Sequence, residues 1–256
     1  MVMRKSAVGI ICRGATRSVV VTAMAFLHSS LASAQAIDTN RPGFSFAVST
    51  IAPGDWQVES GLSWNEPNAD NESWSLPALD LRIGLTQALE VYFTNISWQN
   101  TRLPLGDEVT GWLDPVLGAK WRLDQGEGPF GLAILAQVSV PVGDRAYTSD
   151  RWDPAVGLAW ILGTAIPLAG TARVTIADDE VQFDNGLKLP YTLGDRQVLF
   201  AEWEANLRED SQDAHWLNTG YQFLLDDDRQ LDISAGWGLN DGAGDFRLGA
   251  GFSMRF

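Results

Sequence analysis

Cysteine and histidine are nearly absent from this sequence, and their absence narrows the chemistry that the chain can carry. The 256 residues contain one cysteine, Cys12, and two histidines, His28 and His215. Cys12 and His28 both lie in an N-terminal stretch that we expect to be removed on export. The mature chain would then hold no cysteine, which excludes a disulfide scaffold, and a single histidine.

Long hydrophobic runs are also missing. The apolar run from Val19 to Leu27 is much shorter than the roughly 20 residues that a spanning helix needs, and no later run reaches that length. A chain that spans a membrane without a spanning helix has to form a closed β-barrel.

Basic residues are scarce: the chain has 18 Lys and Arg against 32 Asp and Glu. Residues 1–36 hold four of the basic residues and no acidic residue, so the remainder carries 14 basic and 32 acidic side chains, a net charge of −18. This acidity argues against nucleic acid as a partner. It fits loops and turns that flank a membrane band, although an acidic secreted protein would have a similar composition.

The N-terminal residues have the features of a secretory signal peptide. A basic start at Arg4 and Lys5 precedes the apolar run, and small residues at 32–36 offer a cleavage site. We therefore divide the chain into a signal peptide at 1–36, an irregular segment at 37–54 interrupted by Pro42 and Pro53, and a barrel at 55–256. The segment 37–54, with Asn40 and Arg41, is predicted to plug the lumen or cross the periplasmic mouth.

The sequence from Gln230 to Phe256 alternates apolar and polar residues with a period of two, which is typical of extended strands with one apolar face. The same period recurs along the chain and predicts about twelve strands. A bulge is expected after Asn95, and the strand containing Pro190 is the weakest prediction, because proline cannot donate to a ladder. The expected strands are 56–64, 79–85, 89–94, 113–122, 130–139, 152–162, 171–176, 187–192, 199–208, 216–225, 231–239 and 246–256.

The expected connections alternate between short turns, such as 86–88 and 194–196, and long loops at 65–75, 100–111, 141–151, 177–186 and 208–214; the short connection 240–244 is an exception. This alternation is typical of periplasmic turns and extracellular loops. Aromatic residues near strand ends match the girdle of a membrane barrel: Trp56, Trp64, Trp121, Phe130, Trp152, Phe246 and Phe256. We predict an all-β fold, an antiparallel up-and-down transmembrane β-barrel, over a secreted sandwich or soluble barrel.

The polar faces of these strands would point into the lumen. We interpret their charged and aromatic side chains as a solute pathway; the alternative is that paired charges only fill a narrow barrel. Trp98 is also expected to offer apolar contact. The predicted pathway residues are Glu59, Asp80, Arg82, Glu90, Tyr92, Lys120, Arg122, Arg173, Glu202, Glu204, Trp216, Asp232, Arg247 and Arg255.

The sequence gives little support for a catalytic site or a metal site. His215 lies near Ser211 and Asp213, as an acyl hydrolase would need, but sequence neighbours on a loop rarely supply the geometry of a nucleophile and its base. The acidic runs 178–180 and 226–228 lack the ligand spacing of a calcium loop. We expect no catalytic residues, no metal and no cofactor.

Several blocks of sequence resemble, in order, a family of outer-membrane transporters named for the MetA (meta-cleavage) pathway of phenol degradation. The blocks are IDTNRPGFSFAVSTIAPGDWQVESGLSW, LRIGLTQALEVY, LGAKWRL, LAQVSVPVGDR, the AEW segment and GWGLND with GFSMRF. Asn40 stands where the family usually has Asp.

The resemblance implies an outer-membrane protein of a Gram-negative bacterium, a transporter associated by name with the degradation of aromatic compounds, and leaves the solute open. Our own hypothesis is passive passage of small solutes, with aromatic or hydrophobic compounds as candidates. Alternatives are a closed structural or adhesive barrel and, third, the acyl hydrolase. The expected partners are outer-membrane lipid, an unidentified solute and the barrel-assembly machinery, which would bind the strand ending at Phe256.

Overall fold

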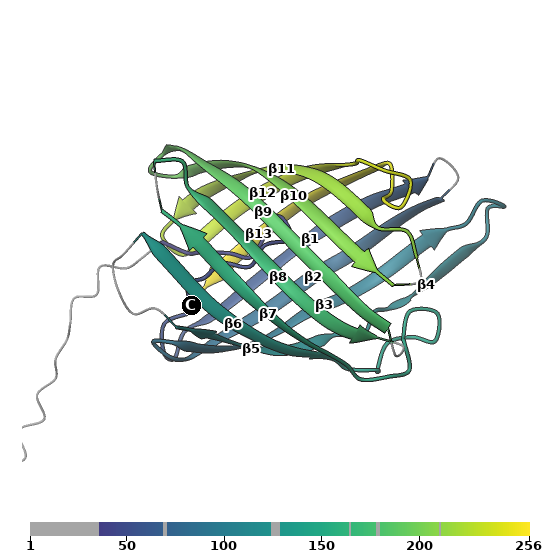
Figure 1. The fold of residues 1–256 in the computed structure, drawn as a ribbon, viewed down its shortest axis with the longest axis horizontal. Coiled ribbons are helices and arrows are strands. Elements are labelled where there is room, and N and C mark those ends of the chain that lie inside the picture. Colours follow the sequence, from purple (N-terminus) through teal and green to yellow (C-terminus); the bar gives the residue numbers. More distant parts are fainter. Residues whose placement is uncertain (1–35, 69–70, 124–128, 164, 178–179, 210) are drawn as a thin grey trace, which may run out of the picture. The chain divides into compact units, whose positions relative to one another are not determined.

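The computed structural model describes residues 36–68, 71–123, 129–163, 165–177, 180–209 and 211–256, and nearly all of this chain is β-strand (Figure 1). The predicted signal peptide lies outside the described residues except for its last position. No helix among the described residues is long and apolar enough to cross a membrane. The strands are β1 (Trp56–Asn68), β2 (Asn71–Thr86), β3 (Leu89–Arg102), β4 (Glu108–Trp112), β5 (Val116–Arg122), β6 (Phe130–Ser139), β7 (Asp153–Leu162), β8 (Leu168–Ala177), β9 (Glu180–Gly194), β10 (Gln197–Arg208), β11 (Ala214–Asp226), β12 (Arg229–Gly238) and β13 (Phe246–Arg255).

The strands form one closed antiparallel barrel. Apart from β4 and β5, each strand pairs with its neighbours in sequence, and β13 returns to pair with β1 over ten registered positions, from Gln57–Arg255 to Glu66–Phe246. β4 and β5 both pair with β3 and occupy one strand position that is interrupted at Leu113–Pro115. The barrel therefore has twelve strand positions, which confirms the predicted fold class and strand number.

The two ends of the barrel differ. At the terminal end, Trp56 and Phe256 exchange backbone hydrogen bonds of 2.8 and 2.9 Å, and tight turns such as 195–196 and 227–228 join the strands. The opposite end, here called the loop end, carries the connections 103–107, 140–152, 209–213 and 239–245.

Three connections predicted as long loops, 65–75, 100–111 and 177–186, are mostly strand, the second because β3 continues to Arg102 and β4 begins at Glu108. The expected loop 65–75 is shortened because β1 continues to Asn68 and β2 begins at Asn71, and the expected loop 177–186 is shortened because β9 begins at Glu180. These extensions carry polar residues such as Glu66 and Glu72. A strand that leaves the lipid no longer needs an apolar outer face, so the alternation weakens while the ladder continues.

Two local predictions concern irregular backbone. The predicted bulge is present: Asn95 has φ 59°, and the β2–β3 register shifts between Leu79 and Leu81. Pro190 lies within β9, but the pairing of β9 with β8 ends at Lys188. Around Pro190 the strand has only β10 beside it, a position that tolerates a residue with no backbone N–H.

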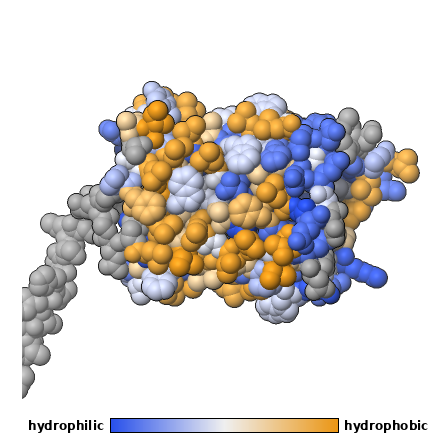
Figure 2. Space-filling view, in the orientation of Figure 1, coloured by the Kyte–Doolittle hydropathy of each residue, from blue (hydrophilic) through white to orange (hydrophobic). Residues whose placement is uncertain are grey.

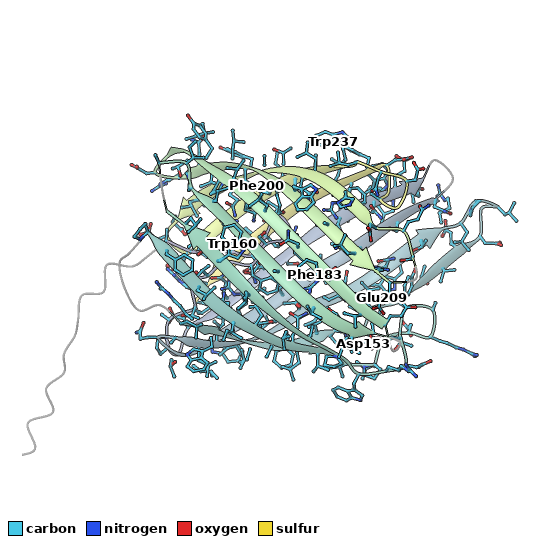
Figure 3. The ribbon with its side chains drawn as sticks, viewed as in Figure 1. Asp153, Trp160, Phe183, Phe200, Glu209 and Trp237 are labelled. Atoms are coloured by element: carbon cyan, nitrogen blue, oxygen red, sulfur yellow. The ribbon has the colours of Figure 1, made fainter. Side chains whose placement is uncertain are left out.

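The outer wall is apolar and the interior is polar. Large hydrophobic side chains are exposed around the barrel, including the predicted girdle residues Trp56, Trp121, Trp152 and Phe256. Figure 2 shows a broad hydrophobic area over the wall and a hydrophilic area toward the loop end. Side chains stand off both faces of the strands (Figure 3). Most of the fully buried large side chains are polar or charged, among them Arg82, Lys120 and Glu202, as expected when the apolar face meets lipid.

Candidate functional site

The lumen contains two layers, and the first is formed by the segment 37–54, here called the plug. The plug has no regular secondary structure, and its backbone bonds to inward side chains from strands all around the barrel. Its start is tied to the terminal end, where Ile37 N donates to Asp227 O at 2.7 Å. Its end is tied to β2, where Gly54 N donates to Gly84 O at 3.0 Å.

Three buried carboxylates accept hydrogen bonds from the plug backbone. Glu59 on β1 accepts from Asn40 N at 3.2 Å and Arg41 N at 2.9 Å. Glu202 on β10 accepts from Phe44 N and Ser45 N, both at 2.8 Å. Glu90 on β3 accepts from Ile51 N at 2.9 Å. Charge-assisted bonds of this kind are roughly twice as strong as neutral ones, so these three residues hold the plug at both ends and its middle.

Two buried cations donate to plug carbonyls and neutralise two of these carboxylates, Glu59 and Glu90. Arg82 Nη1 lies 2.8 Å from Asp38 O, and Lys120 Nζ lies 2.8 Å from Ala47 O. Arg82 also pairs with Glu59 and Glu90 at 3.0 Å, and Lys120 pairs with Glu90 at 3.1 Å. A buried charge is tolerated when it is paired and hydrogen-bonded. The plug therefore completes a network that the wall alone leaves partly unsatisfied.

Glycines allow the plug to approach the wall closely. Gly43 has φ +118°, and a Cβ there would lie 2.7 Å from Glu202 Oε2. Gly61 and Gly251 leave room on β1 and β13 for the Arg41 guanidinium, whose Nη2 lies 3.5 Å from Asp232. Any side chain at these three positions would push the plug away from its partners.

The middle of the plug also has an apolar contact. Val48 packs against Ala133 and Ala159 on β6 and β7, together with Phe46. The Phe46 ring lies 5.6 Å from that of Tyr92, whose hydroxyl donates to Gln137 Oε1 at 3.1 Å. Small inward residues on these two strands thus make space for plug side chains.

The second layer is a cavity of about 840 Å³ between the plug and the loop end, here called the vestibule. Its floor is plug residues 40–44 and 46, and its lining reaches the loop-end termini of several strands at Asn65, Arg208 and Arg247. The wall mixes apolar residues such as Trp64, Leu113 and Val116 with charged ones and with a larger group of neutral polar side chains: Ser63, Asn65, Ser75, Thr94, Asn95, Ser97, Gln137, Ser139, Thr175, Gln182, Asn206, Asn218 and Ser234.

Two arginine clusters lie on the β8–β13 side of the vestibule. In the first, Arg173 donates to Asp184 at 2.8 Å, and Asn206 Nδ2 donates to the other Asp184 oxygen at 3.0 Å. The Arg173 guanidinium lies 5.2 Å from the centre of the Phe44 ring. This ring belongs to the plug, so the cluster also contacts the vestibule floor.

In the second cluster, Arg247 pairs with Glu204 and donates to Asn218 Oδ1 at 2.9 Å. Its guanidinium lies 4.4 Å from the centre of the Trp216 ring. Two further carboxylates line the vestibule from strands flanking this side, Asp153 on β7 and Asp80 on β2.

The predicted pathway residues thus fall into three places. Glu59, Arg82, Glu90, Tyr92, Lys120, Glu202 and Asp232 form the layer around the plug, with Asn40 and Arg41 from the plug itself. Asp80, Arg173, Glu204, Trp216 and Arg247 line the vestibule. Arg122 and Arg255 belong to neither group: both are at the terminal end, where Arg255 pairs with Asp228 at 2.7 Å. Their role in a solute pathway remains a prediction for every one of these residues.

The expectation for Trp98 was wrong. Its side chain is 38% exposed on the wall, whereas Ser97 is buried and lines the vestibule. The bulge at Asn95 reverses the phase of β3, so residues after it point to the opposite face from the one that the period of two predicts.

His215 lies at the start of β11, where its ring stacks on Trp203 at 5.7 Å with an interplanar angle of 12°. Trp203 is on the outer face of β10. Within the described chain no hydrogen bond joins His215 to Ser211 or Asp213, and no three His, Cys, Asp or Glu side chains gather as metal ligands.

Sequence reasoning missed the neutral residues and one acid that complete the network. Thr171, Gln222 and Gln230 bond the plug, and Asp184 holds Arg173. Asp184 was assigned to the loop 177–186. The alternation of Val181 and Phe183 with Gln182 and Asp184 could have placed it inside a strand.

A family model described as "Putative MetA-pathway of phenol degradation" matches residues 39–256. The chain belongs to this family. The matched range includes most of the plug as well as the barrel. The resemblance noted in the sequence blocks is therefore confirmed at the level of the family, and no curated protein matches the sequence.

Solved structures similar to this MetA-pathway family member are outer-membrane barrels. The COG4313 outer membrane channel from Pseudomonas putida F1 has a TM-score of 0.64 at 14% identity, with 84% of this chain and 100% of that chain covered. The KdgM porin has a TM-score of 0.50 at 11% identity over 79% and 98% of the two chains. The β domain of the Bordetella autotransporter BrkA has a TM-score of 0.50 at 16% identity over 80% and 99%. At these identities the likeness shows the fold.

Proposed function

We propose that this protein is an outer-membrane channel that passes small polar solutes passively and is closed by its plug. The observation that carries the proposal is the vestibule: about 840 Å³ of polar-lined space whose floor is a segment held by hydrogen bonds and ion pairs. A channel needs lining groups that replace part of a solute's hydration. The neutral amides and hydroxyls of the vestibule supply such groups.

Polar solutes fit the vestibule better than the aromatic or hydrophobic solutes that the sequence suggested. Two vestibule aromatics, Trp216 and Phe44, already have a guanidinium over their rings. The remaining wall is mainly amide, hydroxyl and salt-bridged charge. An apolar solute entering this space would remove water from these groups without replacing its hydrogen bonds.

Planar-bilayer conductance tests the proposal on two proteins, the full mature chain and the chain lacking residues 37–54. We expect the full chain to be closed for most of the recording and the shortened chain to conduct steadily, because the plug spans the lumen. Folding of the shortened chain is checked by its heat-modifiable migration on a gel. A folded barrel without the plug that neither conducts nor takes up solute in liposomes would refute the channel.

A closed structural or adhesive barrel is the second candidate. It is favoured by the number of strands to which the plug is hydrogen-bonded. The plug bonds to β1, β2, β3, β5, β8, β10, β11 and β12. This reading predicts that the full chain never conducts under any voltage or solute gradient, and that the shortened chain leaks unselectively.

A further inference from the structure

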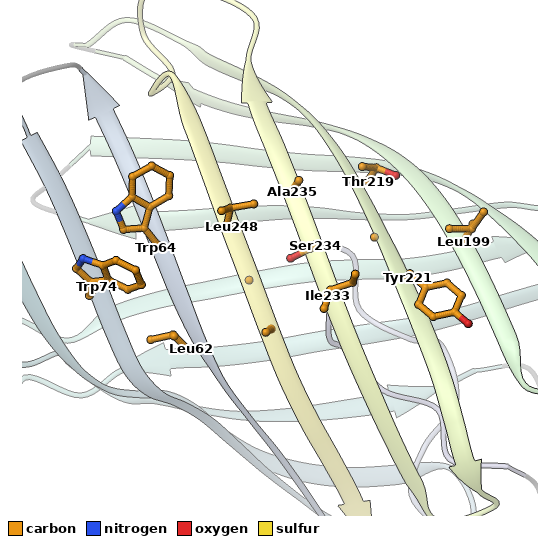
Figure 4. A pocket seen from close by; sticks show the side chains of 13 residues that line it. Leu62, Trp64, Trp74, Leu199, Thr219, Tyr221, Ile233, Ser234, Ala235 and Leu248 are labelled. Carbon is orange, nitrogen blue, oxygen red and sulfur yellow. The ribbon is translucent and has the colours of Figure 1, made fainter.

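The outer wall of the barrel has a groove over β10, β11, β12, β13, β1 and β2, and five of its lining residues also line the vestibule: Trp64, Ser234, Ala235, Leu248 and Gly249. The groove encloses about 530 Å³ (Figure 4). The strand register explains how it forms. One row of paired positions runs Leu62, Ala250, Ile233, Tyr221, Leu199. The next row runs Trp64, Leu248, Ala235, Thr219.

Small side chains at the centre of these rows make the depression. Ala250 lies between Leu62 and Ile233 in the first row, and Ala235 and Thr219 follow Leu248 in the second, so large side chains border these three small ones. The inward positions behind the groove, Gly220, Ser234 and Gly249, are also small, and they too line the groove. The groove floor is therefore the strand backbone itself.

Two hydroxyl groups of the groove already have partners. Thr219 Oγ1 donates to Phe200 O at 2.8 Å, and the Tyr221 hydroxyl donates to Gln197 Oε1 at 2.9 Å. The backbone of the floor is engaged in the ladders of β11, β12 and β13. A guest thus meets mainly carbon atoms, which selects an apolar guest.

Aromatic rings border the groove on the side of the loop end. Trp64 lies 6.0 Å from Trp74 and 6.1 Å from Phe246, and Phe246 lies 5.4 Å from Trp237. Tryptophans gather at the membrane interface, where their rings lie at the level of lipid headgroups. The groove lies next to this belt, in the part of the wall that faces hydrocarbon.

We propose that the groove is a binding site for one acyl chain of a membrane lipid, whose headgroup lies at the aromatic belt. The groove is continuous with the lipid-facing surface, so lipid reaches it without any opening of the barrel. A second copy of the chain fits less well, because a two-fold contact would place a concave patch against the same concave patch. Between lipid tails and an apolar wall the attraction comes from packing, and a groove contacts a chain on more sides than a flat wall does.

Native mass spectrometry of the mature protein in detergent, titrated with phosphatidylethanolamine, tests the site. Ala235→Leu and Ala250→Leu fill the groove, and Ala136→Leu is the matched control, an exposed alanine on β6 that faces outward far from the groove. We expect the wild type and the control to retain one lipid that each filled variant binds about tenfold more weakly, which corresponds to about 1.4 kcal/mol.

Equal retention by the filled variants and the wild type would overturn the proposal. Dimer ions that disappear in the filled variants, with no change in the lipid adduct, would assign the groove to a second copy instead. Heat-modifiable migration shows that each variant is folded. The result does not depend on conductance, so it is independent of the channel proposal.

Discussion

Glu202 accepts two plug N–H groups at 2.8 Å each, shorter bonds than the two that Glu59 accepts. In Glu202→Gln the volume is kept, but the side chain has one acceptor oxygen in place of two, and its amide group faces a backbone donor. A buried donor left without a partner costs about 1–3 kcal/mol. We expect the fraction of time in the open state to rise about tenfold, measured as open probability in planar bilayers.

Glu108→Gln provides the control for this substitution. Glu108 is an exposed carboxylate at the loop end that pairs with Arg102 at 3.6 Å. Its variant should open no more often than the wild type. If both variants opened equally often, the effect would reflect net charge and not the loss of plug bonds.

Arg247 is expected to set ion selectivity in the vestibule. Its guanidinium is partly exposed and lies beside Glu204 and Trp216. In Arg247→Gln the negative charge of Glu204 loses its partner, so the vestibule becomes more attractive to cations. The reversal potential in a KCl gradient should shift toward that of a cation-selective channel, when the variant is measured in a chain lacking residues 37–54.

Arg102→Gln in the same shortened background is the comparison for Arg247→Gln. Arg102 is more exposed and lies at the loop end, where solvent and salt screen its charge. Its reversal potential should stay near that of the parent. An unchanged reversal potential in Arg247→Gln would mean that solutes do not pass this part of the wall.

At the scale of elements, a disulfide can test whether the plug has to move. A Cβ at Gly186 would lie 2.6 Å from Ser45 Oγ and 2.7 Å from Phe44 Cδ1, so a cysteine there requires only that the Phe44 ring shifts. Ser45→Cys with Gly186→Cys should therefore cross-link the plug to β9. The chain's one native cysteine, Cys12, lies in the predicted signal peptide, so the mature protein offers no competing thiol.

We expect the oxidised double-cysteine protein to stay closed and the reduced protein to open as the wild type does. Each single-cysteine variant, treated with the same oxidant, shows the effect of the substitution alone. Conductance that is equal before and after oxidation would mean that solutes pass without displacement of the plug.

The connection 140–152 is held to the barrel at Asp144 and Tyr147, which bond Trp112 and Val109, and by the carboxylate of Asp114, which holds more of its donors than any other side chain described. Asp114 accepts from Gly143 N at 2.7 Å, from Thr148 Oγ1 at 3.0 Å and from Ser149 N at 3.0 Å. In Asp114→Ala these donors lose their acceptor and the loop should open locally. We expect trypsin to cut after Arg145 or Arg151 several times faster, while the rest of the barrel stays intact. Asp107→Ala, in the neighbouring exposed turn, should leave the rate of cutting unchanged.

The barrel could be predicted from sequence because its wall depends on a pattern repeated on every strand. Where strands leave the lipid, as at Glu66 and Glu72, the pattern fades and the predicted loops were too long. A single irregular residue, Asn95, was enough to send Trp98 to the wrong face. The period of two in a sequence does not show where a bulge shifts the side chains from one face of a strand to the other.

The contents of the lumen were only half predictable. The inward carboxylates and cations were visible as polar-face residues, but their partners were not. Glu202 bonds Phe44 across 158 positions of sequence and Arg82 bonds Asp38 across 44. The alternation of polar and apolar residues does not show whether a charged side chain faces another strand, the plug or water. The sequence therefore could not distinguish a lumen filled by paired charges from a lumen that conducts solutes.

At the scale of the whole molecule, the plug separates the stability of the barrel from the closure of its lumen. The wall is closed by its own ladders, including the ten paired positions of β1 and β13, and its outer face is independent of residues 37–54. The charges around the plug are different, because Glu59, Glu90, Arg82 and Lys120 are fully buried by it. When the plug is absent, water enters the lumen and restores hydration to these side chains, which offsets most of the lost hydrogen bonds.

We therefore expect the mature chain lacking residues 37–54, refolded into detergent from denaturant, to form the same barrel. Its unfolding temperature should fall by only a few degrees, consistent with a change of about 1–2 kcal/mol in a protein of this size. Circular dichroism at increasing temperature measures this change.

Glu59→Leu in the full chain is the opposite case: it leaves the plug in place, and Arg82 in the dry interior loses one of its two carboxylate partners. Because an uncompensated buried charge is costly, this single substitution should lower the unfolding temperature more than removal of the entire plug does, and the reverse order would mean that the plug is part of what keeps the wall folded.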